Sequence, residues 1–294
     1  MAKQMSIIQF SGKLGETVGQ RSAKGNQIIR RRAEKVSNPQ TAAQAAQRMK
    51  LAPASNFYRA LSGLLDHSFQ GVKYGAMSHA KFNELAMRMT SGFPFVAKGD
   101  VTPYPGEYVI ATGGLAPVII TDIADGMAST SLGLSVTFDD GDPVMPVTIG
   151  AMSQALLDEN PTLKEGDQLT FVFCCVKNSV IFYHYGRFII DTTSTATMEA
   201  WYKSQKVYFV YNDGLWIAPS DGDNELAPNI YGAAVIVSRP PRKAGGDWQR
   251  SMTTFKVSAE YKESLMSNNQ YNFALATYMQ KVSNVNSDWY LNEG

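Results

Sequence analysis

The feature that most constrains the fold is a series of short, apolar, β-branched segments beyond residue 106. Turn sequences such as FDDGD at 138–142 and NDG at 212–214 separate them, as expected between paired antiparallel strands. The predicted strands are EYVIAT, LAPVIIT, SLGLSVTF, QLTFVFCCV, SVIFYHYGRFII, KVYFVY, LWIAP, YGAAVIVSR and SMTTFKV. So many short strands predict a β-sandwich or a partly open barrel.

A helical module precedes the strands, over residues 38–92. Asn38 is a good N-cap, and Pro39 suits the first helical position because its missing N–H costs nothing there. We expect Pro53 to end or kink this first helix. A stripe of small side chains at helical spacing permits close packing inside the domain or against another subunit: Ala42, Ala45, Ala46 and Met49.

Two further amphipathic helices are predicted, at 56–69 and from Ser78 onward, and a last one at about 259–282. The sequence therefore predicts an α+β protein. Its predicted parts are a basic N-terminal arm or hairpin (1–37), the helical module (38–92), an antiparallel β-sandwich (106–257), and a C-terminal helix and tail (258–294).

Charge is distributed unevenly along a chain whose net charge is only +1. Residues 1–50 carry ten basic residues against Glu16 and Glu34, a net charge of +8, which leaves −7 for the remainder. Such asymmetry indicates a polyanionic or acidic partner. The predicted contact residues are Lys13, Arg21, Lys24, Arg30, Arg31, Arg32, Lys35, Arg48 and Lys50.

Most of these residues belong to a predicted hairpin whose turn is KGN at 24–26. Arg30 and Arg32 would share one strand face, and Arg48 and Lys50 extend the charge onto the following helix. Two interpretations stay open. One is a solvated surface or an arm on the acidic surface of a neighbouring subunit; the other is non-specific, salt-dependent contact with nucleic acid phosphates. Aromatic residues for base stacking are sparse here, so nucleic acid would be contacted through its backbone.

No sequence pattern points to catalysis or to a bound metal. His67, His79 and His184 have no ligands at metal-binding spacing. There is no G-x-S-x-G elbow, and GKLGETVG does not meet the phosphate-loop consensus. The acidic stretches FDDGDP and SDGDNE do not complete an EF-hand loop. We therefore expect a protein that is not an enzyme, with no cofactor, no metal and no catalytic residue.

The cysteines and the apolar segments bear on cellular location. Cys174 and Cys175 are adjacent in a predicted strand, so they point to opposite faces and should not form a mutual disulfide. No secretory signal is visible, and no apolar stretch approaches the roughly 18 residues of a membrane helix. We therefore expect neither export nor contact with a membrane.

A family resemblance is carried by GKLGETVG, VSNPQTAAQAAQRMK and YGAMSHAKFNELAM. These motifs resemble an uncharacterised family, a domain of unknown function, from gut Bacteroidetes and their phages and mobile elements. The resemblance is best over residues 10–90. It implies an N-terminal module joined to an immunoglobulin-like sandwich, and it transfers no catalytic residue.

The leading functional hypothesis is a non-enzymatic structural or assembly protein, a phage-derived virion component. Its expected partners are further copies of itself or other structural subunits, with nucleic acid as an alternative partner of the basic segment. The alternative hypothesis is a free cytoplasmic protein that binds nucleic acid without sequence specificity. An enzyme whose site is assembled from distant loops is the third.

Overall fold

The computed structural model describes residues 11–21, 27–31, 41–220, 229–243 and 245–279. The chain forms two compact units, residues 1–41 and 42–294. The described residues contain seven helices and several antiparallel sheets, which confirms the predicted α+β class. Within them, none of the helices has the length and apolar character needed to span a bilayer.

The first unit contains a three-stranded antiparallel sheet, called the hairpin sheet below. Its strands are β1 (Gly12–Leu14), β2 (Thr17–Arg21) and β3 (Gln27–Arg31), in the order β1-β2-β3. Arg21 pairs with Gln27, so the predicted hairpin between β2 and β3 is confirmed. Its turn at 24–26 and the predicted cap at Asn38 and Pro39 lie outside the described residues.

The second unit is built on a central antiparallel sheet whose middle strands are buried on both faces. Its strands are β9 (Gln168–Lys177), β10 (Val180–Ile189), β13 (Ile230–Arg239), β14 (Gln249–Arg250) and β16 (Lys256–Val257). They are ordered β10-β9-β13-β14, and β16 pairs with β13. Alternate residues of β9 enter different cores, as the pleat requires. Cys175 enters the first core and Cys174 the second, as predicted, and neither forms a disulfide.

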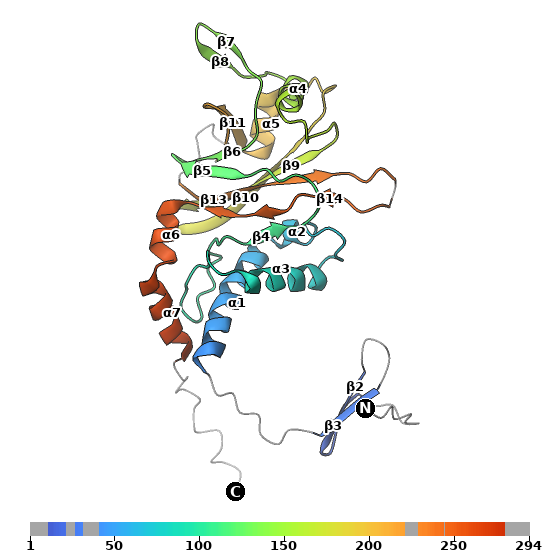
Figure 1. Ribbon diagram of the computed structural model, residues 1–294, viewed down its shortest axis with the longest axis vertical. Coiled ribbons are helices and arrows are strands. Elements are labelled where there is room, and N and C mark those ends of the chain that lie inside the picture. Colours follow the sequence, from blue (N-terminus) through green and yellow to red (C-terminus); the bar gives the residue numbers. More distant parts are fainter. Residues whose placement is uncertain (1–10, 22–26, 32–40, 221–228, 244, 280–294) are drawn as a thin grey trace. The chain divides into compact units, whose positions relative to one another are not determined.

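One face of the central sheet packs against a second antiparallel sheet and two helices (Figure 1). The second sheet has the order β11-β12-β6-β5. Its strands are β5 (Ile120–Ala124), β6 (Met127–Thr130), β11 (Val207–Tyr211) and β12 (Leu215–Pro219). The two helices are α4 (Ile149–Glu159) and α5 (Met198–Gln205). The neighbouring hairpin is formed by β7 (Thr137–Asp139) and β8 (Asp142–Val144). The rings of Phe171 and Phe209, one from each sheet, are 5.3 Å apart.

The other face of the central sheet is covered by helices (Figure 1). These are α1 (Ala42–Ala60), α2 (Ser62–Leu65) and α3 (Ala76–Arg88), with the short pair β4 (Val109–Ala111) and β15 (Thr253–Thr254) beside them. Phe57 of α1 is fully buried and contacts the ring of Phe255 at 5.5 Å. The helices and the central sheet therefore share one core, which also contains Val172 and Ile236.

The chain ends in two helices, α6 (Ala259–Leu265) and α7 (Asn268–Met279), where the sequence predicted one. The break falls at Ser267, whose hydroxyl accepts a hydrogen bond from the Gln270 backbone N–H at 3.3 Å, as in a helix N-cap. Two members of the small-residue stripe of α1, Ala45 and Met49, are buried within the domain against α7, whereas Ala42 is exposed.

The first helix does not end at Pro53, contrary to one of the two outcomes expected there. α1 continues through Pro53 to Ala60, so the predicted second helix is the end of α1 followed by α2. Met49, Pro53 and Phe57 are buried at i, i+4 spacing. The packing of this face compensates for the backbone hydrogen bond that proline removes.

Candidate functional site

The hairpin sheet places basic side chains on both of its faces. Lys13, Val18 and Arg30 occupy one cross-strand row, and Arg31 lies in the next row, which points to the opposite face. Lys13, Arg30 and Arg31 are all exposed. The guanidinium of Arg31 lies 3.9 Å from the Glu16 carboxylate, an exposed pair that contributes little to stability.

Apolar side chains of the hairpin sheet are exposed beside these charges. The exposed fractions are 63% for Leu14, 50% for Ile28 and 39% for Ile29. In the described part of residues 1–41, only Gly19 is buried, so the sheet buries no apolar side chain. The hairpin sheet thus presents a mixed basic and apolar surface.

The other predicted contact residues are divided between the two units. Arg21 ends β2, whereas Arg48 and Lys50 lie on α1 in the second unit. The Lys50 ammonium lies 4.7 Å from the centre of the Phe93 ring, a cation–π contact within that unit. Three predicted residues lie outside the described part of the chain: Lys24, Arg32 and Lys35.

The histidines have separate structural surroundings. His184 Nε2 is 2.8 Å from the Gln205 carbonyl oxygen, and burial lowers the pKa of His184 below its ordinary value. The His79 ring packs 4.6 Å from the ring of Tyr58. Among the described residues there is no group of three or more His, Cys, Asp and Glu side chains that could hold a metal ion. Of the two acidic stretches, FDDGDP forms the β7–β8 hairpin, and residues 221–225 of SDGDNE lie outside the described part.

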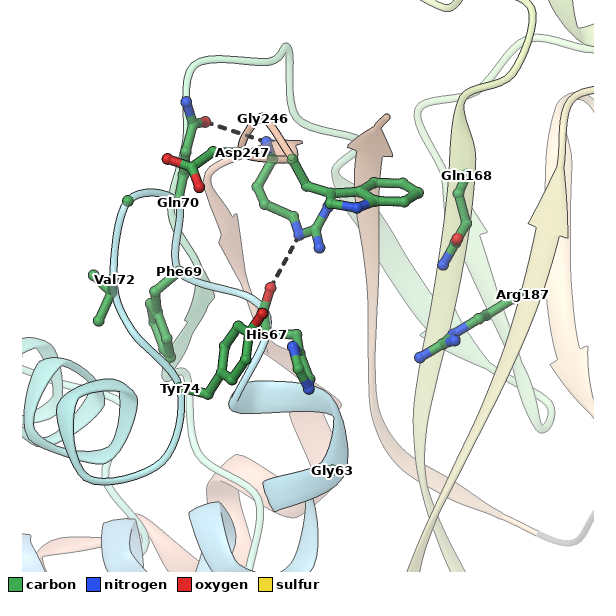
Figure 2. Close-up of a pocket in the computed structure, with 13 residues that line it drawn as sticks. Gly63, His67, Phe69, Gln70, Val72, Tyr74, Gln168, Arg187, Gly246 and Asp247 are labelled. Carbon is green, nitrogen blue, oxygen red and sulfur yellow. Dashed lines mark hydrogen bonds between the residues drawn. The ribbon is translucent and has the colours of Figure 1, made fainter. Parts of the chain in front are cut away.

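A cavity of about 460 Å³ in the second unit brings together residues that no sequence motif connects. Residues 63–74 form one side and residues 246–250 another, and Gln168 of β9 and Arg187 of β10 complete it. Figure 2 shows Gln168 and Arg187 pointing from neighbouring strands toward the side on which His67 and Tyr74 lie. Its volume is within the range of small-molecule sites, about 300–1,000 Å³.

Two hydrogen bonds made by Arg250 join two sides of this cavity. Its side-chain Nε donates to the His67 carbonyl oxygen at 3.1 Å, and its backbone N–H donates to Gln70 Oε1 at 3.3 Å. Gly113 lies at the same junction, where an added Cβ would be 2.1 Å from the Arg250 carbonyl oxygen and 2.6 Å from Gln70 Oε1. A side chain at Gly113 would therefore separate the loop from β14.

Two guanidinium groups line the cavity without a carboxylate partner among the described residues. Neither Arg187 nor Arg250 forms an ion pair there. Burial, and then the nearby charge of Arg187, lower the pKa of Arg250. Asp247 also lines the cavity and forms no ion pair with a described residue. The cavity therefore holds positive charge that an oxyanion would stabilise.

Aromatic rings stand beside these charges. The Arg250 guanidinium carbon lies 5.1 Å from the centre of the Trp248 ring, and Trp248 is 41% exposed. The Tyr74 ring, 72% exposed, lies 4.5 Å from the His67 ring. The cavity thus combines cationic groups with ring faces that remain accessible to a ligand.

A buried ion pair fixes the strand ends next to the cavity. Arg239 at the end of β13 donates from Nε and Nη2 to the two carboxylate oxygens of Asp167, at 2.6 and 2.7 Å. Asp167 is fully buried, and its neighbour Gln168 lines the cavity. Bidentate pairing of this kind is rigid and directional. A charged contact between the end of β13 and the residue before β9 therefore lies directly beside Gln168.

This cavity has almost no signature in the amino-acid sequence. Its residues come from four segments that are distant along the chain, and only the cross-strand pairing brings them together. His67 is an isolated histidine in the sequence, and no motif contains Arg187, Trp248 or Arg250. The exposed aromatic and arginine pair at 248 and 250 is the one local hint that the chain carries.

Comparison with protein families gives a match over the first part of the chain. Residues 9–142 match a family model described as a family of unknown function (DUF6266). The resemblance seen over residues 10–90 therefore extends further along the chain. The matched segment covers the hairpin sheet, α1 to α3 and one side of the cavity, whereas Gln168, Arg187 and residues 246–250 lie beyond it. No curated protein and no solved structure matches this chain.

Proposed function

We propose that the chain is a non-enzymatic assembly protein whose hairpin sheet binds an acidic surface on a neighbouring copy of the same chain. The observation that carries this proposal is the surface of the hairpin sheet, where Leu14, Ile28 and Ile29 are exposed beside basic side chains. A small sheet with exposed apolar groups is marginally stable in water. A protein surface that covers these groups stabilises the sheet, and a polyanion backbone covers them less well.

Charge supports a second copy as the partner. Residues 1–41 carry eight basic residues against Glu16 and Glu34, a net charge of +6, which leaves −5 for residues 42–294. Opposite charges on the two units favour contact between the hairpin sheet of one copy and the second unit of another. Such a contact uses different surfaces on the two copies, so it can build rings or extended assemblies.

We further propose that the assembly is a phage particle and that the two packed sheets are a variant of the immunoglobulin-like sandwich. The resemblance of residues 10–90 to proteins of Bacteroidetes and their phages supports the first statement. The face-to-face packing of two antiparallel sheets supports the second. The protein is expected in purified particles, and its absence from them would count against the phage setting.

A second candidate function is non-specific nucleic-acid binding by the same sheet. The observation that favours it is the row that joins Lys13 and Arg30, neither of which forms an ion pair with a described residue. Two cations on one row can contact successive phosphates of a backbone. This function needs the charges and does not need the exposed apolar residues.

Separate variants test the two functions. Self-association of the full chain is measured by analytical ultracentrifugation, and binding of a labelled oligonucleotide by fluorescence anisotropy at rising salt. One variant changes Lys13, Arg30 and Arg31 to Glu, and a second changes Leu14 and Ile29 to Ser. The matched control reverses three exposed lysines of the second unit: Lys164, Lys177 and Lys243.

We expect concentration-dependent association that both hairpin variants reduce at least tenfold. The control variant, whose second unit becomes more acidic, should associate at least as strongly as the wild type. A monomer at all concentrations would overturn the assembly proposal. Oligonucleotide binding that only the charge variant weakens, with a smaller salt slope, would assign the sheet to nucleic acid instead.

A further inference from the structure

We propose that the cavity lined by Arg187, Arg250 and Trp248 binds a nucleotide, either free or as one unit of a single-stranded nucleic acid. The cavity belongs entirely to the second unit, so this proposal does not depend on the role of the hairpin sheet.

The phosphate is the part of the ligand that the two arginines select. Arg187 and Arg250 come from different strands, line the same cavity, and form no ion pair with a described residue. Arg250 Nε donates a hydrogen bond to the His67 carbonyl oxygen at 3.1 Å. This bond holds the guanidinium group in place before a ligand arrives. Arg187 is exposed and can complete the contact from the opposite side. A phosphate group accepts several such bonds and relieves the repulsion between the two cations.

The aromatic side chains of the cavity favour a ligand that contains a planar ring. Trp248 and Tyr74 both line the cavity and are exposed there. The Trp248 ring lies beside the Arg250 guanidinium, and the Tyr74 ring lies beside the His67 ring. Stacking of a base on such a face stabilises binding by about 1–3 kcal/mol and tolerates any base. Inorganic phosphate and simple sugar phosphates lack this contribution.

Polar groups around the rings fit the remaining parts of a nucleotide. Asp247 lines the cavity and can accept a hydrogen bond from a sugar hydroxyl or a base amine. Gln70 uses its side-chain oxygen for the Arg250 backbone N–H, so its amide NH₂ stays available as a donor. The volume of about 460 Å³ accommodates one nucleotide unit.

The test uses the full chain and four probes in isothermal titration calorimetry: AMP, adenosine, inorganic phosphate and a short single-stranded oligonucleotide. The main variant is Arg187→Gln, because this exposed side chain can be changed without loss of a buried contact. Trp248→Leu tests the stacking surface. The matched control is Arg242→Gln, an exposed arginine on the same β13–β14 connection but outside the cavity. Thermal melting confirms that each variant is folded.

We expect AMP to bind more tightly than phosphate or adenosine. Arg187→Gln and Trp248→Leu should each weaken AMP binding at least tenfold, and Arg242→Gln should leave it unchanged. Binding of the oligonucleotide without AMP, lost in the same two variants, would identify the strand as the source of the nucleotide. The proposal is overturned if neither AMP nor the oligonucleotide binds, or if both cavity variants bind like the wild type. Reversal of Lys13, Arg30 and Arg31 should not alter AMP binding, which separates this outcome from that of the hairpin sheet.

Discussion

At the residue scale, the helical core contains tyrosine hydroxyls in opposite situations. The hydroxyl oxygens of Tyr108 and Tyr261 are buried and find no hydrogen-bond partner among the described residues. The Tyr58 hydroxyl instead donates to Asp66 Oδ1. A buried hydroxyl without a partner loses its hydration and gains nothing in return. The hydroxyl group is therefore predicted to destabilise the folded protein at Tyr108 and Tyr261 and to stabilise it at Tyr58.

Tyr108→Phe should raise the free energy of unfolding by about 1 kcal/mol, because it removes a hydroxyl that is buried without a partner. Tyr58→Phe is the matched control, and it should lower the free energy of unfolding by about 1 kcal/mol because it breaks the bond to Asp66. Urea denaturation followed by circular dichroism measures both. An equal loss in the two variants would show that Tyr108 has a polar partner.

At the element scale, His184 couples β10 to the end of α5 through the carbonyl oxygen of Gln205. Burial lowers the pKa of His184 in the folded protein, so the unfolded chain takes up a proton more readily. Stability is then complete above the ordinary histidine pKa of about 6.5 and falls as the pH drops toward the lower pKa of the folded state.

The free energy of unfolding should therefore decrease between pH 7 and pH 5, and His184→Gln should show a smaller decrease over that interval. Urea denaturation at closely spaced pH values measures the difference. Above pH 7 the imidazole is neutral in both states, so the two proteins should have parallel stability curves there. If the free energy of unfolding of the two proteins falls equally below pH 7, another group causes the acid sensitivity.

The elements differ in how well the sequence predicted them. β9, β10 and β13 follow directly from their apolar and β-branched residues, and α3 from its helical spacing. β6, in MAST at 127–130, carries no strong β signal and is a strand because β5 and β12 pair with it. Propensity is a local property, and these differences arise from packing between distant segments.

The candidate sites differ in the same way. The charge of the hairpin sheet is contiguous in sequence, so it could be predicted, although its exposed Leu14 and Ile29 were not part of that prediction. The cavity was missed because Arg187 and Arg250 are joined only through the registers of β9, β10, β13 and β14. Strand order is not encoded in any local pattern.

At the scale of the whole molecule, the two compact units should differ in their contribution to stability. Removal of residues 1–41 should change the free energy of unfolding of the remainder by less than about 0.5 kcal/mol, because the described part of that unit buries no apolar side chain. The matched control removes α6 and α7, with buried Tyr261, Ala274 and Tyr278, and should destabilise the protein. Thermal melting compares the two. A loss of stability on removing residues 1–41 as large as that of the control would contradict this expectation.

Because β9 is buried on both faces, the order in which its neighbours are synthesised decides how long the strand stays exposed. Its seven consecutive buried residues, 169–175, form the kind of apolar strand that aggregates when it is exposed. On the ribosome, α1 to α3 emerge before β9, so the cover for one face already exists when the strand appears. β10 follows within a few residues and closes one edge, but β13 is made only after α5, β11 and β12. During that interval the second edge of β9 is open, and a chaperone that binds extended apolar segments has its target there.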